Sequence, residues 1–217
     1  MVLFSMTSPR ALYPIPKLVL ASLSPRRQAL LSLMGIVFEV SGSYIEEQAL
    51  SGESPYDFTR RMASEKARSV GQSFGDAWIL GADTVVVIDD RIMGIPSNDR
   101  EALDMLKTLS GKTHSVFTSF CFYRPCMEEC MVRTVESKVV IKGLSSDEIN
   151  GYIHSGEPFD KAGGYAVQGL GAFMVREIHG SYTNVVGLPL CALVKALLTT
   201  GALRSFPPDA GDGFPQE

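Results

Sequence analysis

The chain has 217 residues, of which 45% are hydrophobic and 20% are charged, and its formal net charge at pH 7 is −4. These proportions are typical of a globular chain that can bury one good core, as one lobe or as two lobes around a cleft. The acidic balance disfavours a general nucleic-acid-binding protein, which usually presents a basic face, whereas a small polyanionic ligand requires only a local basic pocket.

The two ends of the chain differ in composition from its centre. Residues 1–16 start apolar but are interrupted by prolines, so they make a poor signal peptide and are predicted to form a flexible N-terminal extension. Residues 205–217 are rich in proline, glycine and aspartate, which predicts a disordered tail and leaves 17–204 as a single domain. No apolar run reaches membrane-spanning length, and the four cysteines lack zinc-finger spacing, so we expect a cytoplasmic protein with reduced thiols.

The first elements in chain order follow from apolar runs and helix start signals. A helix over residues 25–34 begins after Ser24, a favourable N-cap, with Pro25 at its first position. Around this helix the sequence predicts a buried strand at 17–22, a second short strand at 36–40 and a polar loop at 42–54.

The middle of the chain contains the strongest strand signal. A helix with apolar residues along one face is predicted over residues 55–70. The run at 78–89 is apolar and rich in β-branched residues, which predicts a central strand interrupted by one polar pair. An amphipathic helix with inward-facing leucines is expected over residues 99–109.

Two strands at 114–123 and 131–141 flank a short segment and are predicted to form an antiparallel hairpin. A helix over 145–155 starts with a capping box. The remaining elements are expected to be a glycine-rich functional loop at 159–172, a strand at 173–178 and a helix at 188–198. Alternating strands and helices with one hairpin predict an α/β protein with a mixed sheet.

The start of the helix at 25–34 is the most informative stretch for function. Arg26 and Arg27 lie in its first turn, where each positive charge opposes the helix dipole at a cost of roughly 0.3–1 kcal/mol. Backbone N–H groups beside two guanidinium groups suit an anion, and a phosphate chain is the obvious one. The alternative is an ordinary capped helix with solvated arginines.

A carboxylate inside the central strand is the second candidate. Asp83 lies in an apolar run, where its charge is costly unless it is paired or binds a metal, and Thr84 adds a hydroxyl beside it. Glu46 and Glu47 end an extended stretch whose alternation would point one of them into a cleft. A glutamate near Asp83 would make a hard-cation site, because magnesium takes one or two carboxylates and fills its other positions with water and phosphate oxygens. The alternatives are an aspartate bonded to a nearby turn and a solvated glutamate pair.

Three further polar residues are candidates of differing strength. Lys66 lies on the helix at 55–70 and is, taken alone, most simply a surface lysine. Lys161 precedes two glycines that allow the backbone to approach a ligand closely. The Gln168 amide can read a base edge or hold a water. The sequence contains no Walker loop, dinucleotide-binding fingerprint or readable Ser/His/Asp triad.

Seven segments between about residues 17 and 200 form a specific combination. They read Ala-Ser-Leu-Ser-Pro-Arg-Arg at 21–27, Ile-Glu-Glu-Gln at 45–48, Glu-Lys-Ala at 65–67, Gly-Ala-Asp-Thr-Val-Val at 81–86, Leu-Ser-Gly-Lys-Thr-His at 109–114, Asp-Lys-Ala-Gly-Gly-Tyr-Ala-Val-Gln-Gly at 160–169, and Gly-Ser-Tyr followed by Asn-Val-Val-Gly-Leu-Pro-Leu within 180–190. In this order they closely resemble the Maf family of nucleoside triphosphate pyrophosphatases.

The resemblance implies an elongated, two-lobed Maf/ITPase-like α/β architecture on a mixed twisted sheet with a central cleft, and often a homodimer. It implies cleavage of a nucleoside triphosphate between the α and β phosphates with a divalent metal, Mg²⁺ or Mn²⁺. The segment at 160–165 resembles the branch that prefers dTTP and UTP over the branch that acts on 7-methyl-GTP.

The resemblance also assigns roles to individual residues. The implied substrate-binding residues are Ser22, Arg26, Arg27, Thr84 and Lys161. The implied catalytic residues are Asp83, Glu47, Lys66 and Gln168, with Asp83 and Glu47 as metal ligands and Asp83 as the general base. In these roles the cations and the metal would stabilise the charge that develops when water attacks the α-phosphorus.

One position departs from the family pattern. The family usually has a lysine where this chain has Ile95, and losing one charge-assisted contact costs about 1.5–3 kcal/mol, or one to two decades in rate. The rival hypothesis is therefore a nucleotide-binding regulator with weakened catalysis, linked to cell division. A general RNA- or DNA-binding module is a third interpretation, which the acidic charge disfavours.

Overall fold

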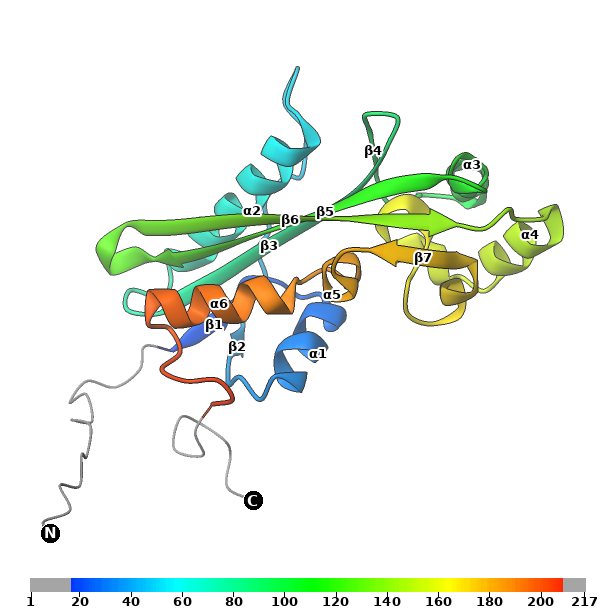
Figure 1. The fold of residues 1–217 in the computed structure, drawn as a ribbon. Helices are drawn as coiled ribbons and strands as arrows, with labels where there is room; N and C mark the ends of the chain where they lie inside the picture. Colours follow the sequence, from blue (N-terminus) through cyan, green and yellow to red (C-terminus); the bar gives the residue numbers. More distant parts are fainter. Residues whose placement is uncertain (1–16, 209–217) are drawn as a thin grey trace, which may run out of the picture.

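A mixed sheet of seven strands runs along the elongated protein in the computed structural model, which describes residues 17–208 (Figure 1). The strands are β1 (Leu18–Leu20), β2 (Glu39–Val40), β3 (Trp78–Ile88), β4 (Arg91–Met93), β5 (Thr113–Arg124), β6 (Glu129–Ile141) and β7 (Val175–His179). Their order is β2-β1-β3-β5-β6-β7, with β4 paired to β3. The predicted extension at 1–16 and the part of the predicted tail at 209–217 lie outside the described residues.

The predicted central strand, β3, connects the parallel and antiparallel parts of the sheet. β1 is parallel to both β2 and β3, whereas β3 is antiparallel to β4 and β5. β5 and β6 form the predicted hairpin, and β7 continues the antiparallel part beside β6. The α/β class and the mixed sheet expected from the sequence are confirmed.

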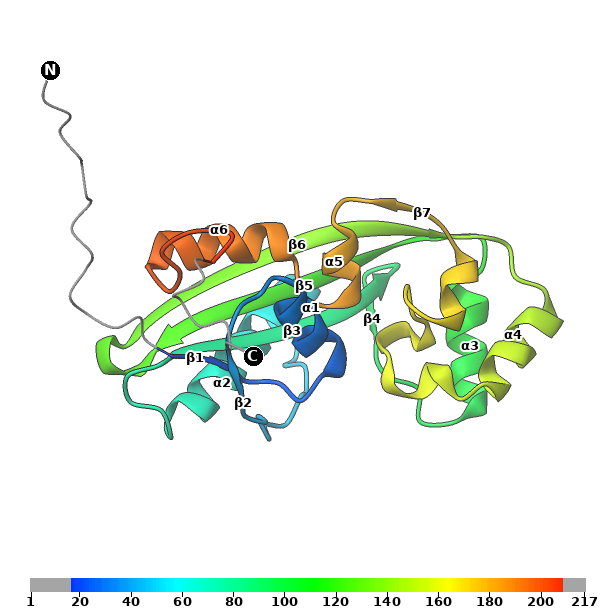
Figure 2. The ribbon, with the colours of Figure 1, turned by 90° about the horizontal axis from the view of Figure 1, so that it is seen from below.

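Helices cover both faces of the sheet and one of its ends. In the described part of the chain they are α1 (Pro25–Leu33), α2 (Pro55–Gly71), α3 (Asp99–Leu109), α4 (Ser146–His154), α5 (Tyr182–Val186) and α6 (Leu190–Thr200). Short 3-10 turns lie at Pro125–Met127, Glu157–Asp160, Ala162–Gly164 and Leu170–Met174. Figure 2 shows α3 and α4 together at one end of the sheet, away from α2 and α6. Between residues 17 and 208, no helix has both the length and the apolar character for crossing a membrane.

Side chains of β3 enter four hydrophobic cores, one of which joins Val85 and Val87 to the start of α2. Leu80 packs with residues of α1 and α6, Ile79 packs with residues of α2 on the opposite face, and Val86 packs with residues of α3 and α4 at the far end. This follows from the alternation of side chains along a strand, because successive residues point to opposite faces. Asp83 therefore lies in the stretch of β3 where the two ends of the molecule meet.

Several boundaries differ from the sequence predictions for local reasons. β4 was not predicted: Asp89 and Asp90 adopt left-handed backbone angles, φ 50° and 60°, and form a tight turn that brings β4 back onto β3. The five-residue α5 was also not predicted, and α6 starts at Leu190 because Pro189 occupies its N-cap position. The strand expected at 173–178 starts at Val175 because a 3-10 turn precedes it. The strand expected at 36–40 is limited to β2, which pairs only with β1.

A glycine sets the distance between α2 and β3. A Cβ atom at Gly81 would lie 2.2 Å from the Ala63 carbonyl oxygen and 2.7 Å from the Ala67 backbone nitrogen. No other residue type fits without moving the helix, since these contacts are to backbone atoms. The close approach brings α2 near enough for a helix side chain to reach the polar residue of β3.

We expect Gly81→Ala to destabilise the protein by about 3 kcal/mol or more, because overpacking against backbone atoms cannot be relieved by a rotamer change. Gly75→Ala is the matched control, since nothing lies within 4 Å of a Cβ at Gly75. Urea unfolding followed by circular dichroism measures both. Equal unfolding midpoints for the two variants would contradict the close-packing argument.

Candidate functional site

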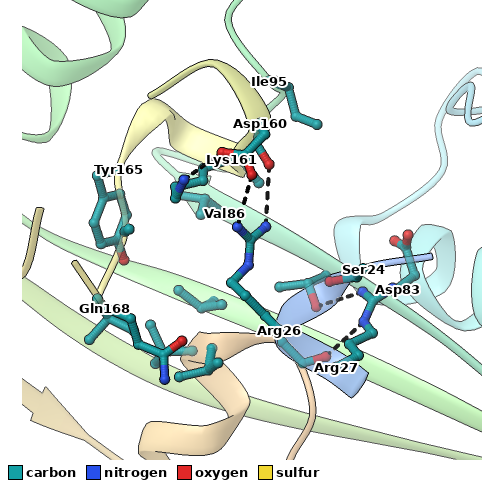
Figure 3. A pocket seen from close by; sticks show the side chains of 18 of the residues that line it. Ser24, Arg26, Arg27, Asp83, Val86, Ile95, Asp160, Lys161, Tyr165 and Gln168 are labelled. Atoms are coloured by element: carbon teal, nitrogen blue, oxygen red, sulfur yellow. Dashed lines mark hydrogen bonds and ion pairs between the residues drawn. The ribbon is translucent and has the colours of Figure 1, made fainter. Parts of the chain in front are cut away.

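A pocket of about 230 Å³ collects side chains from α1, α2, β3 and the turn at Glu157–Asp160 (Figure 3). Of the nine site residues predicted from the sequence, eight line this pocket: Arg26, Arg27, Glu47, Lys66, Asp83, Thr84, Lys161 and Gln168. The ninth, Ser22, contacts one of them, because its hydroxyl oxygen accepts a hydrogen bond of 3.2 Å from Arg27 Nη1. The structure thus brings together residues that are as much as 146 positions apart, between Ser22 and Gln168.

A buried lysine joins the two predicted metal-ligating carboxylates. The Lys66 ammonium lies 2.7 Å from Asp83 Oδ1 and 2.7 Å from Glu47 Oε1. Asp83 is 3% exposed and Lys66 7% exposed, so the interpretation of Lys66 as a surface lysine is wrong. Oδ2 of Asp83 is buried and has no hydrogen-bond partner. Burial raises the pKa of the Asp83 carboxyl, and the positive charges of Lys66 and Arg27 oppose that rise.

Arg27 is fixed by three acceptors from three parts of the chain. Its Nε donates to the Gly187 carbonyl oxygen at 3.0 Å, Nη1 to Ser22 Oγ at 3.2 Å and Nη2 to Thr84 Oγ1 at 3.3 Å. Burial lowers the pKa of the guanidinium, and the negative charges of Asp83 and Glu47 oppose that change. The arginine at the start of α1 is therefore held in place and is not a solvated surface arginine.

Ser24 occupies the N-cap position of α1 as predicted, but the prediction that its side chain caps the helix is wrong. The Ser24 side chain makes no capping hydrogen bond. The backbone N–H of Ser24 instead donates to Ser22 Oγ at 3.2 Å. Ser22 thus accepts from both the backbone of Ser24 and the side chain of Arg27, and Ser24 lines the pocket.

Arg26 reaches across the pocket to the turn that precedes Lys161. Its Nη1 donates to Asp160 Oδ2 at 3.2 Å and its Nη2 to the Asp160 carbonyl oxygen at 3.3 Å. Lys161 forms an ion pair with Asp160 and donates to the Glu157 carbonyl oxygen at 2.8 Å. Figure 3 shows Asp160 lying between the two cations. Asp160 was not singled out from the sequence, although its place beside Lys161 and the glycines was a usable signal.

Gln168 and Tyr165 line the side of the pocket away from Arg27 and Asp83, whereas Ile95 lies near Asp160 (Figure 3). Gln168 is exposed, and Ile95 is 58% exposed with no charge to offer. The Tyr165 hydroxyl lies 2.8 Å from Nε2 of the buried His114, a pairing that nothing in the sequence indicated. This part of the pocket combines apolar surface with one amide.

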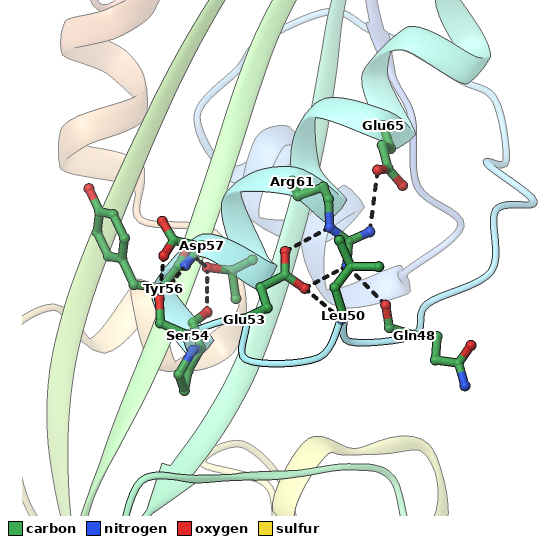
Figure 4. Close-up of polar contacts among 10 residues, drawn as sticks. Gln48, Leu50, Glu53, Ser54, Tyr56, Asp57, Arg61 and Glu65 are labelled. Carbon is green, nitrogen blue, oxygen red and sulfur yellow. Dashed lines mark hydrogen bonds and ion pairs between the residues drawn. The ribbon is translucent and has the colours of Figure 1, made fainter.

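A second cluster holds the loop that carries Glu47 (Figure 4). Arg61 on α2 donates to both oxygens of Glu53 at 2.7 Å and to the Gln48 carbonyl oxygen at 2.9 Å. The expectation that strand alternation orients Glu47 is wrong, because residues 41–54 form no strand. The loop predicted at 42–54 is confirmed, and its contacts with α2 hold it beside Lys66.

We expect Glu53→Gln to lower stability in a pH-dependent way. Hydrogen bonds from Arg61 hold the pKa of Glu53 at about 2, below its ordinary value of 4.5. The ionised pair therefore stabilises the fold fully above about pH 4.5, and this contribution is lost as the pH falls towards 2. Urea unfolding at several pH values should give a deficit for the variant at pH 7 that shrinks below pH 4.5. A deficit that stays constant over this range would contradict the assignment.

The fold and the pocket together define a mixed α/β protein in which a cationic site faces a buried carboxylate. The profile of a family described as Maf-like protein matches residues 17–200. The chain therefore belongs to the Maf family, as its sequence motifs predicted.

Individual relatives cover most of the chain. A protein named dTTP/UTP pyrophosphatase from Syntrophus aciditrophicus (strain SB) is 51% identical over 187 residues, which are 86% of this chain and 91% of that protein. A second dTTP/UTP pyrophosphatase, from Geobacter metallireducens (strain ATCC 53774 / DSM 7210 / GS-15), is 48% identical over 86% of this chain and 97% of its own length. A third protein of that name, from Aquifex aeolicus (strain VF5), is 46% identical over 83% of this chain and 94% of its own length.

Proposed function

We propose that this protein is a nucleoside triphosphate pyrophosphatase that hydrolyses dTTP, UTP and related modified pyrimidine triphosphates to the monophosphate and pyrophosphate. The observation that carries the proposal is that Arg27 and the Asp83–Lys66–Glu47 cluster line one pocket. The names of the relatives at 51% and 48% identity support the choice of substrate. The same names do not favour a regulator with weakened catalysis.

The cationic side of the pocket suits a triphosphate. Arg26, Arg27 and Lys161 offer guanidinium and ammonium donors from two sides of the pocket. Charge on the phosphate oxygens increases as water attacks the α-phosphorus, and donors that are already oriented stabilise it without further reorganisation. Ser22 and Thr84 contribute to this binding site, and both accept hydrogen bonds from Arg27.

Asp83 has the properties of a general base. It is buried, its pKa is raised by that burial, and Oδ2 has no partner in the protein. Lys66 holds the other oxygen, Oδ1, at 2.7 Å and so fixes the orientation of the carboxyl group. A water hydrogen-bonded to the Asp83 carboxylate would give a proton to it as the water oxygen bonds to the α-phosphorus, and the bond between that phosphorus and the bridging oxygen breaks to release pyrophosphate.

The two carboxylates also fit a divalent cation, Mg²⁺ or Mn²⁺. Asp83 and Glu47 would be the protein ligands, because their carboxylates both lie within 2.7 Å of the Lys66 ammonium and so close to each other. Two carboxylates match the share that magnesium takes from protein when phosphate oxygens and water fill its other positions. The unpartnered Oδ2 of Asp83 supports this fit. The bound cation would supply positive charge against the phosphate oxygens.

Gln168 completes the proposed set as the residue that orients the substrate or the attacking water. Its exposed amide lies toward the mixed polar and apolar end of the pocket, where a pyrimidine base would meet both donors and acceptors. Because the proposed substrates are free nucleotides, we also propose that the protein acts in the cytoplasm. The homodimer implied by the family stays a prediction.

With Mg²⁺ or Mn²⁺, we expect the purified protein to release pyrophosphate, and not orthophosphate, from dTTP and UTP. A coupled pyrophosphate assay over a panel of canonical and modified triphosphates measures this. No pyrophosphate above background with any of them would reject the proposed function.

We expect Asp83→Asn to lower kcat by about 10³-fold, within the range for losing a general base, while the protein stays folded.

Glu47→Gln and Glu46→Gln form a matched pair from neighbouring positions of one loop. Only the Glu47 variant should have a lower kcat and require a higher metal concentration for half-maximal activity. Glu47 contacts Lys66, whereas the exposed Glu46 is not part of the pocket lining. Equal kinetics for the pair would argue against Glu47 as a ligand.

Ile95→Lys tests the departure from the family pattern. The side chain lines the pocket and is 58% exposed, so a lysine has room to extend towards the phosphates. We expect kcat/KM to rise by about tenfold, the lower part of the range for one charge-assisted contact. Ile95→Met is the control for side-chain size, and a similar gain in both variants would rule out the charge as the cause.

A further inference from the structure

A line of hydrogen bonds leads from Arg27 into the interior of the protein. Thr84 on β3, which accepts from Arg27 Nη2, lies directly opposite Thr118 on β5, with their hydroxyl oxygens 2.9 Å apart. Thr118 is fully buried and donates to the backbone carbonyl oxygen of Asn184 on α5 at 2.9 Å. Four residues from four elements therefore connect in series.

The chemistry of these groups fixes the direction of every proton. The Asn184 carbonyl can only accept, so the single hydroxyl proton of Thr118 is used there. Thr118 then has only lone pairs left for Thr84, and the Thr84 proton is used in that bond. Thr84 is left as an acceptor, which is what the donor-only guanidinium of Arg27 requires.

The far end of the series is firmly attached. Asn184 is fully buried, and its side-chain Nδ2 donates to the Val116 carbonyl oxygen and to Ser137 Oγ, each at 3.0 Å. The segment after α5 also supplies the Gly187 carbonyl that accepts from Arg27 Nε at 3.0 Å. The α5 region thus holds Arg27 twice, directly through Gly187 and indirectly through the two threonines.

We propose that Thr118 is a positioning residue for the reaction: through Thr84 it holds the Arg27 guanidinium in the orientation that meets the phosphates. Thr118 does not touch the substrate. Thr84 acts mainly as the acceptor that orients Arg27, since its one proton is committed to Thr118. The inference rests on the proposed function for the role of Arg27 and adds two positioning residues to it.

Thr118→Val removes the hydroxyl at nearly constant shape, and Thr118→Ser restores it. Thr59→Val is the matched control, because Thr59 is also fully buried and its hydroxyl is hydrogen-bonded, but on α2 and away from Arg27. In Thr118→Val the Thr84 hydroxyl proton loses its acceptor and can turn towards Arg27, which weakens the hydrogen bond from that charged group. We therefore expect kcat/KM for dTTP to fall about tenfold and the inhibition constant of pyrophosphate to rise. Thr118→Ser and Thr59→Val should stay within about twofold of the original protein.

Stability alone would not give this pattern, because both valine variants lose a buried hydroxyl. A Thr118→Val variant that keeps kcat/KM and the pyrophosphate inhibition constant within twofold would overturn the proposal. A Thr118→Ser variant as impaired as Thr118→Val would also overturn it, since the hydroxyl would then not be the cause.

A measurement without substrate separates this proposal from the proposed function. Side-chain NMR of the Arg27 Nε–H group, assigned by its loss in Arg27→Lys, reports how firmly the guanidinium is held. Exchange with solvent should be faster in Thr118→Val than in Thr59→Val. Equal exchange overturns the positioning role even if pyrophosphate is released. Faster exchange in a protein that releases no pyrophosphate would support the positioning role and reject the proposed function.

Discussion

A lysine ammonium between two carboxylates is the interaction on which the geometry of the pocket depends. Asp83 lies on a buried strand, where an unpaired negative charge would be far too costly. Lys66 compensates it from α2 and at the same time draws in Glu47 from a loop. One cation therefore fixes the relative positions of a strand, a helix and a loop, and the packing of α2 on Gly81 makes its reach to Asp83 short enough.

The sheet gives this cluster its place between the two ends of the molecule. β3 contributes side chains to separate cores on both faces and at the far end, so the stretch that carries Asp83 lies between these cores. The cations approach from α1 on one side and from the turn around Asp160 on the other. The pocket thus takes residues from segments that share little packing except through this strand.

Local sequence signals predicted the elements that depend on local chemistry. The apolar run of β3, the hairpin of β5 and β6, and the capping box of α4 were all recognisable, because strand alternation and helix caps are properties of neighbouring residues. The turn at Asp89 and Asp90 was missed because two non-glycine residues adopt left-handed backbone angles there, and the short α5 was missed because five residues carry too little helical periodicity. Predicted boundaries shifted by a few residues where a proline or a 3-10 turn precedes the element.

The residues of the candidate site also fall into those that the sequence indicated and those that it did not. Arg26, Arg27 and Asp83 stood out because each is costly where it lies, and a costly residue points to a ligand or a partner. Lys66 was ordinary on its own and became informative only through the resemblance to a family. Thr118 gave no signal, because a buried threonine in a strand is unremarkable until the residue opposite is known.

The contact of Arg26 with Asp160 has a consequence for how the pocket fills. The lining contains four cationic side chains and three carboxylates, so most of its positive charge is already neutralised from within. An incoming anion that takes over the Nη1 donor of Arg26 displaces the Asp160 carboxylate, which makes its arrival an ion exchange and not a simple neutralisation. Such an exchange gains little from long-range attraction, so the pocket discriminates by the number of contacts that an anion can complete at once.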